Sequence, residues 1–316
     1  MSSDYSLAKL RQGFKDRGVF YTPPELALFL RSLIPGNPSR VYDPTCGRGN
    51  LLSVFPDEAE KYGQDIDAEA VADAAKALVN FTGATGDLFT DPHWLNERFD
   101  AIVANPPFSI AWEPINDERF AEAPTIPTAG RADYAFLLHI LHMLADGGTA
   151  AVLSFPGVLY RGGREGQLRQ WLVEQNVIDA VVHIPGDTFT DTAIATACIV
   201  LKKGRETTCI RFVDNAHEIE RVVPVEEVAS NGYTLSVSAY VQPEQPEAPP
   251  VDAIALEAQA RANALRKIRA EIEMSILVAE LEGLSVFGFL DSIDDLVDEF
   301  RVTRIRQKAL PMGEAA

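Results

Sequence analysis

A short segment rich in proline contains the residues best suited to chemistry. Directly after the apolar run Phe99–Ala104 come Asn105, Pro106, Pro107 and Phe108. The two prolines fix the backbone and remove two N–H donors, so the Asn105 side-chain oxygen and the Pro106 carbonyl remain as rigid acceptors. Two such acceptors suit a planar –NH2 group and make its nitrogen lone pair available as a nucleophile. We predict that these four residues form the catalytic motif.

The aromatic ring of this motif points to a nucleobase as substrate. Phe108 offers a face on which an extruded base can stack, and extrusion is needed because a base cannot be reached inside a duplex. Methylation at cytosine C5 needs a cysteine nucleophile, usually in a Pro-Cys pair, and the sequence has no such pair. The motif therefore favours an exocyclic amine that attacks a sulfonium methyl in line, with orientation and electrostatics as the main catalytic effects.

A glycine-rich turn earlier in the chain suits the methyl donor. The segment Val41–Leu52 reads as a strand that ends in Asp43, followed by a turn containing Gly47 and Gly49. Glycine allows backbone conformations and close approaches that a Cβ would block. The turn has neither the G-x-G-x-x-G fingerprint nor a P-loop lysine, so it does not suit phosphate binding. An acid at the strand end suits the cationic amino group of S-adenosylmethionine.

Two further acids follow at successive strand ends. Asp65 lies about twenty residues after the first turn, where an acid can bind ribose hydroxyls, and Asp87 is placed to accept from the adenine amino group of the cofactor. Acids at three strand ends are hard to explain as solvated surface. We expect the same cofactor site to include the neighbouring residues Pro44, Cys46, Ile66, Leu88 and Asn105.

These motifs lie within an alternation of strand and helix patterns. Such an alternation predicts an α/β fold with a mostly parallel sheet covered on both faces, in which ligands bind beyond the carboxyl ends of the strands. The predicted strands are Arg40–Asp43, Lys61–Gln64, Phe99–Ala104, Gly148–Phe155, Val177–Ile184 and Thr196–Leu201. The predicted helices between them are Ala68–Val79, Tyr134–Ala145 and Glu165–Glu174.

The C-terminal quarter is organised differently. We predict a catalytic domain over residues 1–241, a linker rich in proline and glutamate over residues 242–250, and a helical tail over residues 251–316. From Ile254 to Ala279, apolar residues recur at spacings of three and four, which indicates an amphipathic helix of about thirty residues. Such a helix either docks on a partner or folds back on its own domain.

Composition sets limits on partners and compartment. The net charge of −18 argues against a free-standing nucleic-acid binder, so DNA binding requires a locally basic cleft or a partner that contacts the phosphates. The three cysteines share no CxxC spacing and the five histidines have no metal-ligand spacing, so we expect no metal site and no disulfide framework. Because the chain shows no signal peptide and no segment long enough to span a bilayer, we expect a cytoplasmic protein without a membrane partner.

The ordered series of motifs resembles the gamma-class amino-methyltransferases, most closely the modification subunit of type I restriction-modification systems. The likeness covers about residues 18–241 and begins at GVFYTPPELALFL. By that match Tyr21, Thr22 and Pro23 would border the methionine part of the cofactor. The segment after Asp133–Pro156 resembles one that leads to a target-facing loop, where Phe189 would help to hold the base. YTLSVSAYV looks like the closing motif of the family.

The resemblance implies a fold, an activity and partners. The fold would be the Rossmann-like fold of S-adenosylmethionine-dependent methyltransferases, with a C-terminal helical tail. The activity would be site-specific methylation of adenine N6 in double-stranded DNA. In that family a separate specificity subunit recognises the target and a restriction subunit belongs to the same system; the helical tail would be the docking element.

Three features depart from the family or remain ambiguous. Type I modification subunits usually have a long helical domain before the motif that begins here at Gly18, and smaller residues where this chain has Arg48 and Asn50. Arg48 keeps open the alternative of a catalytically inert scaffold subunit. The cluster of Arg161, Arg164 and Arg169 fits a phosphate contact and a solvated helix face equally well.

Related motifs also leave the substrate open. Similar Asn-Pro-Pro segments occur in methyltransferases that act on other planar amines, namely protein glutamine, RNA bases or cytosine N4. The N-terminal YTP motif and the Phe189 region favour adenine in DNA.

Overall fold

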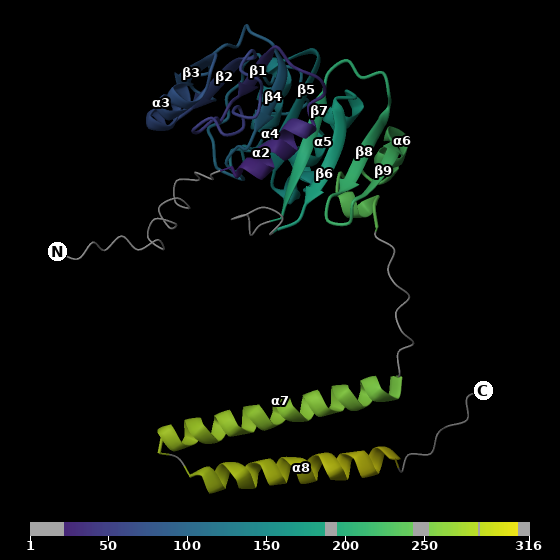
Figure 1. The fold of residues 1–316 in the computed structure, drawn as a ribbon. Helices are drawn as coiled ribbons and strands as arrows, with labels where there is room; N and C mark the ends of the chain where they lie inside the picture. The colour runs from purple at the N-terminus through teal and green to yellow at the C-terminus, as the bar shows by residue number, and fades with distance from the viewer. Residues whose placement is uncertain (1–21, 187–194, 243–252, 284, 309–316) are drawn as a thin grey trace, which may run out of the picture. The chain divides into compact units, whose positions relative to one another are not determined.

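The computed structural model describes residues 22–186, 195–242, 253–283 and 285–308. The described residues form two compact units, one up to residue 242 and one from residue 253 (Figure 1). The first contains the sheet and all the described motif residues, and the second contains two helices. Tyr21 and Phe189 lie outside the described residues.

The first unit is built on one sheet. Nine strands of the described residues lie in the order β3-β2-β1-β4-β5-β7-β6-β8-β9 (Figure 1). The strands are β1 (Arg40–Asp43), β2 (Glu60–Asp65), β3 (Phe81–Thr85), β4 (Phe99–Ala104), β5 (Leu144–Ser154), β6 (Ile178–Ile184), β7 (Thr196–Lys202), β8 (Cys209–Asp214) and β9 (Ile219–Pro224).

The sheet is mostly parallel, as the alternation predicts. Strands β1 to β5 all pair in parallel, whereas β7 runs antiparallel between β5 and β6, and β9 runs antiparallel at the edge. From β1 the chain moves outward through β2 and β3, then returns to the other side of β1 to form β4. This reversal of strand order next to β1 is where open α/β sheets bind their ligands, beyond the carboxyl ends of the strands.

Helices cover both faces of the sheet. The first unit has α2 (Pro24–Ser32), α3 (Ala68–Ala77), α4 (Asp133–Met143), α5 (Gly163–Glu174) and α6 (Val225–Ser230), with short 3-10 helices η1 (Pro156–Leu159) and η2 (Val237–Ala239). Helix α3 begins directly after the second turn because the Asp67 side chain accepts hydrogen bonds from the N–H groups of Glu69 and Ala70.

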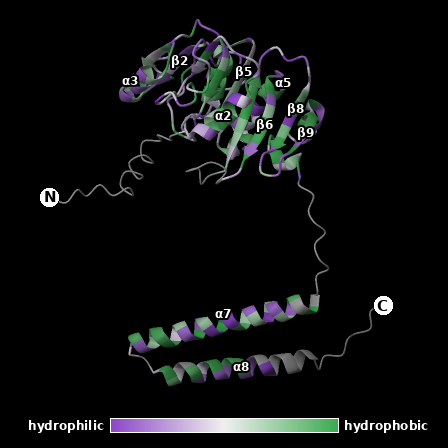
Figure 2. Ribbon diagram, viewed as in Figure 1, coloured by the Kyte–Doolittle hydropathy of each residue, from purple (hydrophilic) through white to green (hydrophobic). Residues whose placement is uncertain are grey.

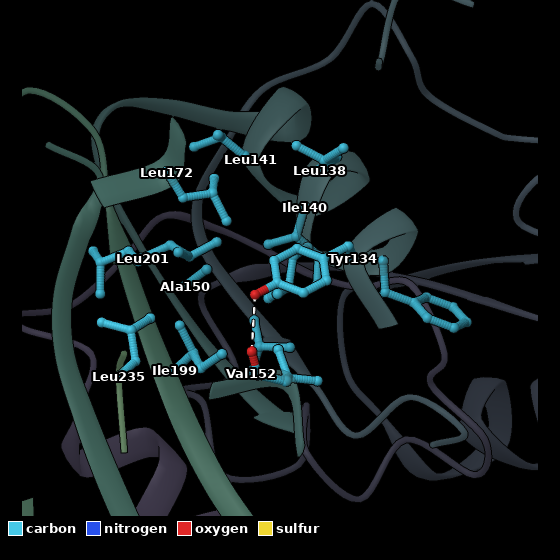
Figure 3. Close-up of a cluster of buried hydrophobic side chains, with 14 of the residues drawn as sticks. Tyr134, Leu138, Ile140, Leu141, Ala150, Val152, Leu172, Ile199, Leu201 and Leu235 are labelled. Carbon is cyan, nitrogen blue, oxygen red and sulfur yellow. Dashed lines mark hydrogen bonds between the residues drawn. The ribbon is translucent and has the colours of Figure 1, made fainter. Parts of the chain in front are cut away.

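The core consists of two apolar clusters, one on each face. Successive residues of β4 and β5 alternate between them: Ile102 and Val152 pack with α4 and α5, whereas Val103 and Leu153 pack with α2 and α3. Both faces are buried, which explains why these strands read as continuous apolar runs. Figure 3 shows the α4 and α5 side, where Tyr134 lies among Ile140, Ala150 and Leu172, and its hydroxyl donates to the Val158 carbonyl at 2.9 Å.

The second unit is a pair of helices, α7 (Ala253–Leu281) and α8 (Val286–Lys308). Helix α7 confirms the predicted helix of about thirty residues, and α8 lies in the segment predicted as a helical tail. Hydrophobic and hydrophilic residues alternate along α7 (Figure 2). Apolar residues of both helices face solvent, including Ile254 and Leu265 of α7 and Phe287 of α8, with exposed fractions of 81%, 67% and 81%. No helix in the described part of the chain is both long and apolar enough to cross a membrane.

A buried arginine joins three segments of the first unit. The guanidinium of Arg169 donates to the carbonyls of Tyr233 at 2.7 Å, Arg161 at 2.8 Å and Val158 at 3.3 Å. The residue is 4% exposed, so these carbonyls have little access to water as a replacement. Arg169 therefore fixes the predicted closing motif and η1 against α5, which excludes it from contact with a phosphate backbone.

We expect Arg169→Met to lower the free energy of unfolding by about 3 kcal/mol, because it leaves buried carbonyls without donors. Urea denaturation measures this change. Arg164→Met is the matched control, since Arg164 is an exposed arginine on the same helix, and it should change stability by less than about 0.5 kcal/mol. Equal effects of the two substitutions would contradict the structural role of Arg169.

Candidate functional site

The parallel pairing of β1, β2, β3 and β4 brings the predicted site residues to one edge of the sheet. Asp43 ends β1, Asp65 ends β2, Asp87 follows β3 and Asn105 follows β4. Side chains that are as much as sixty residues apart in sequence therefore lie at neighbouring strand ends. We call this region the carboxyl edge.

The glycine turn after β1 has the geometry that its sequence requires. Gly47 and Gly49 have φ angles of +49° and +82°, which side chains disfavour. A Cβ at Gly49 would lie 2.6 Å from Leu78 Cδ1, so the turn packs closely on the residues around α3. Arg48 points away: its side chain is 67% exposed and pairs with Asp73 at 3.4 Å. Arg48 therefore leaves the inner side of the turn unobstructed.

Asp43 is buried beneath this turn. It is 1% exposed, and its Oδ1 accepts from the Thr45 N–H at 3.0 Å. Burial raises the pKa of Asp43 to about 8, and the nearby charge of Asp65 acts in the same direction, whereas the Thr45 hydrogen bond opposes both. A buried carboxyl of this kind ionises readily only when a cation lies beside it.

Asp65 connects the ends of β1 and β2. Its Oδ2 accepts from the Gly47 N–H at 2.7 Å and its Oδ1 from the Asp67 N–H at 3.0 Å. Each oxygen retains a lone pair, so the carboxylate can still accept from hydroxyl groups. The next residue, Ile66, is 72% exposed and presents an apolar surface beside this carboxylate.

Asp87 shapes the turn after β3. Its Oδ1 accepts from the N–H groups of Phe89 at 2.8 Å and Thr90 at 3.0 Å, while no described residue donates to its Oδ2. Leu88 is buried in the core. The same holds for Cys46, whose side chain packs against Gly63, and Pro44 is buried as well. Any contact of these three residues with a cofactor therefore involves mainly the backbone.

Thr22 links the glycine turn to the catalytic motif. The Asn50 side-chain amide donates to the Thr22 carbonyl at 3.1 Å, and the Asn105 amide donates to the Thr22 hydroxyl at 3.1 Å. Pro23 is buried and directly precedes α2. The departure at Asn50 thus has a structural function, because its amide holds the N-terminal Thr-Pro segment over the site.

The catalytic motif forms a rigid corner after β4. Pro106 is buried, while Asn105, Pro107 and Phe108 are half-buried. The Asn105 Nδ2 is occupied by Thr22, and no described residue donates to its Oδ1. The Phe108 ring packs against the apolar cluster beneath α2. The corner thus holds an acceptor and an aromatic ring in fixed positions.

A buried network behind Asp87 was missed at the sequence level. Arg119, whose side chain is 0% exposed, donates to the carbonyls of Leu88 at 2.7 Å and Phe89 at 2.9 Å. It also lies 3.4 Å from His139 Nδ1, and His139 Nε2 lies 3.3 Å from the Tyr42 hydroxyl. Since a guanidinium only donates, Nδ1 accepts and Nε2 carries the hydrogen. Burial and the Arg119 charge lower the pKa of His139 well below its usual value and keep it neutral.

This network positions the turn after β3 relative to β1. Arg119 belongs to the long segment between β4 and α4, so the same segment that contains the catalytic corner also fixes the Asp87 turn. A lone arginine in a loop gives no sequence signal for such a role. Among the described residues, no group of three or more His, Cys, Asp and Glu side chains is arranged to hold a metal ion.

The residues of the carboxyl edge fit S-adenosylmethionine. Asp43 offers a carboxyl for the amino group, Asp65 has lone pairs for ribose hydroxyls, and Ile66 offers an apolar surface for an adenine ring. Asp87 retains an acceptor oxygen for the adenine amine. At Gly47 a Cβ would meet nothing within 4 Å, so the inner side of the turn is open.

Comparison with known proteins identifies a family and several relatives of this chain. The model of the family N-6 DNA Methylase matches residues 4–223. The methylase subunit of the type I restriction enzyme MpnII of Mycoplasma pneumoniae is 35% identical over 240 residues, which are 66% of this chain and 44% of that protein. The HindI methylase subunit of Haemophilus influenzae is 27% identical over 62% of this chain and 48% of its own length. The chain thus spans about half the length of the curated relatives it matches.

Solved structures show the same fold. The methyltransferase subunit of a type I restriction-modification system from Streptococcus thermophilus superposes with a TM-score of 0.63 at 27% identity, over 71% of this chain and 59% of that one. The M protein of EcoKI has a TM-score of 0.51 at 18% identity, over 60% and 45% of the two chains, and supports the fold alone. The fold is the Rossmann-like fold of S-adenosylmethionine-dependent methyltransferases. The chain belongs to the N-6 DNA Methylase family.

The raised pKa of Asp43 predicts a dependence of cofactor affinity on pH. Affinity for S-adenosylmethionine should increase from pH 6 to about pH 8, because a growing fraction of Asp43 is ionised. It should decrease above pH 8, where the amino group of the ligand, with an ordinary pKa of about 7.7–8.0, loses its charge. Calorimetric titration across this range measures the profile, and a flat profile would contradict the role of Asp43.

Asp43→Asn should abolish cofactor binding but increase the stability of the cofactor-free protein. In the wild type, the unfolded chain ionises Asp43 near pH 4 but the folded protein does so only near pH 8, so this group lowers stability as pH rises between these values. The neutral amide should therefore raise the melting temperature of the cofactor-free protein at pH 8 by a few degrees while cofactor binding is lost. Asp57→Asn, at an exposed site, is the control and should change neither property.

Proposed function

We propose that this protein transfers a methyl group from S-adenosylmethionine to the N6 amine of an adenine that is extruded from double-stranded DNA. Family membership supports adenine N6 as the target. The observation that carries the proposal is the orientation of the Asn105 amide. Its Nδ2 is bound to the Thr22 hydroxyl, which leaves Oδ1 as the acceptor for an incoming amine.

The arrangement supports a simple division of roles. S-adenosylmethionine, when bound, supplies an electrophilic methyl group on a positively charged sulfur. Asn105 Oδ1 and the Pro106 carbonyl accept the two amine hydrogens and hold the nitrogen lone pair in one direction. The new N–C bond forms as the C–S bond breaks, the sulfur keeps the electron pair of the broken bond, and the amine releases one proton to solvent. Neither step needs a covalent bond to the protein, so orientation and fixed dipoles supply the catalysis.

We further propose that the protein acts as the modification subunit of a restriction-modification system. Its net charge of −18 disfavours unaided binding to DNA, so a separate specificity subunit would supply the phosphate contacts and choose the target. The exposed apolar residues of α7 and α8 favour these helices as its docking element. A restriction subunit would bind the same assembly.

Asn105→Ala tests the acceptor model directly. We expect methyl transfer to fall by at least about 100-fold, because an acceptor for the amine is lost. Affinity for S-adenosylmethionine should stay within about twofold. Tritiated methyl transfer to DNA and calorimetry measure the two quantities. The control is Asn37→Ala, at an exposed position before β1, which should retain full activity. Unchanged transfer by Asn105→Ala would overturn the model.

Phe108→Ala tests base stacking. Loss of one stacked base should weaken the use of duplex DNA by about 1–3 kcal/mol in kcat/KM. Affinity for a duplex with an abasic site at the target position should be nearly unchanged, because that duplex has no base to stack. Steady-state kinetics on the intact duplex and binding to the abasic duplex measure the two quantities, and an equal loss on both would argue against stacking on the flipped base.

The substrate class is best tested in cells. DNA from a strain that expresses the chain with its neighbouring gene products should contain N6-methyladenine at one recurring sequence, detected by long-read sequencing. Methylated protein glutamine or RNA without modified DNA would instead support another planar amine as substrate. Absence of cofactor binding by both the wild type and Asp43→Ala would indicate an inert scaffold subunit.

A further inference from the structure

A cluster of buried charged groups adjoins the catalytic corner. In the described residues, six buried side-chain nitrogen or oxygen atoms have no hydrogen-bond partner. Four of them belong to this cluster, which we call the Asp133 cluster: Ser109 Oγ, Asp133 Oδ2, Arg161 Nη1 and Glu165 Oε2. Asp133 and Glu165 are only 7% and 5% exposed. Such a concentration of unsatisfied atoms in one place is costly for stability and calls for a functional reason.

Asp133 holds the backbone that follows Phe108. Its Oδ1 accepts from the Ser109 N–H at 3.0 Å, and Ser109 has a φ of +52°, in the left-handed region. One residue further on, the Ile110 carbonyl accepts from the Ala132 N–H at 2.9 Å. The chain leaving the catalytic corner is therefore tied to the start of α4 at two successive residues.

Arg161 faces the other oxygen of Asp133. Its guanidinium lies between the Phe155 ring, 5.4 Å from the centroid, and Gly157, where a Cβ would lie 2.6 Å from it. Nη1 is 3.9 Å from Asp133 Oδ2 and 3.6 Å from Glu165 Oε2. A second arginine, Arg131, binds Glu165 Oε1 at 3.3 Å.

Two carboxylates and two arginines thus alternate in a row that ends at Ser109. At separations below 4 Å in a buried site, these opposite charges attract each other and hold the Asp133 carboxylate in one orientation. A charged carboxylate is a stronger acceptor for an N–H group than a neutral one.

We propose that Asp133 is a positioning residue for the catalytic corner. Through the Ser109 N–H it fixes the backbone in the conformation that presents Phe108 and the Asn105 and Pro106 acceptors. Arg161 and Glu165 hold Asp133 in place from the ends of η1 and α5. The role of Asp133 in catalysis rests on the proposed function, whereas its control of the Ser109 backbone does not.

Hydrogen exchange tests the positioning role without any need for activity. In the whole chain, Asp133→Ala should speed amide exchange in residues 108–112 by about 10-fold, the equivalent of one lost hydrogen bond of about 1.4 kcal/mol. Asp133→Asn retains an acceptor oxygen for Ser109 and should restore most of the protection. The matched control is Asp179→Ala, which breaks the ion pair of Asp179 with Arg205 at 3.0 Å at the amino end of β6. This control should leave exchange in residues 108–112 unchanged.

Kinetics separate positioning from general stability. For Asp133→Ala we expect kcat on DNA to fall by at least about 10-fold while affinity for S-adenosylmethionine stays within about twofold, with partial recovery of kcat in Asp133→Asn. Unchanged exchange in residues 108–112, or an equal effect of Asp179→Ala, would overturn the proposal. If exchange responds as expected but the wild type methylates no DNA, the positioning role stands and the proposed function fails.

Discussion

The site depends on the parallel pairing of β4 with β1. Because these two strands are neighbours and run in the same direction, Asp43 and Asn105 emerge at adjacent positions of one edge. Thr22 then joins the two strand ends, since its carbonyl binds Asn50 of the glycine turn and its hydroxyl binds Asn105. The residue proposed to bind the methyl donor and the residue proposed to bind the amine are thereby held by one scaffold.

The carboxyl edge also shows a conflict between function and stability. A carboxyl buried as deeply as Asp43 is costly to ionise, and its raised pKa records that cost. The Asp133 cluster shows the same conflict, because its four unsatisfied atoms adjoin the catalytic corner. Folding alone favours a complete set of hydrogen-bond partners for each buried polar group. Buried polar groups that lack some of these partners therefore tend to lie at functional sites.

The sequence predicts the central strands of the sheet better than the edge strands. Strands such as β4 are recognisable because burial on both faces demands consecutive apolar residues. By contrast β3, β8 and β9 lie toward the sheet edges and mix polar with apolar residues, so their pattern is weak. Asp43 and Asp65 could be placed at the carboxyl edge from the sequence because they lie at the ends of predicted strands. Arg119 could not, since its role depends on carbonyls thirty residues away and on a histidine in α4.

The net charge of the chain and the contacts of its individual arginines give different information about DNA binding. The total of −18 is a sum over the whole chain and says little about any one surface, yet two of the three arginines that the sequence offers for a phosphate contact are already engaged. Arg169 binds carbonyls and Arg161 faces two carboxylates, whereas Arg164 is exposed. Arginines bound in this way are poorly placed to release counterions from a phosphate backbone, which is the main source of affinity for DNA. The engagement of these two arginines supports the proposal that a partner subunit supplies most of the phosphate contacts.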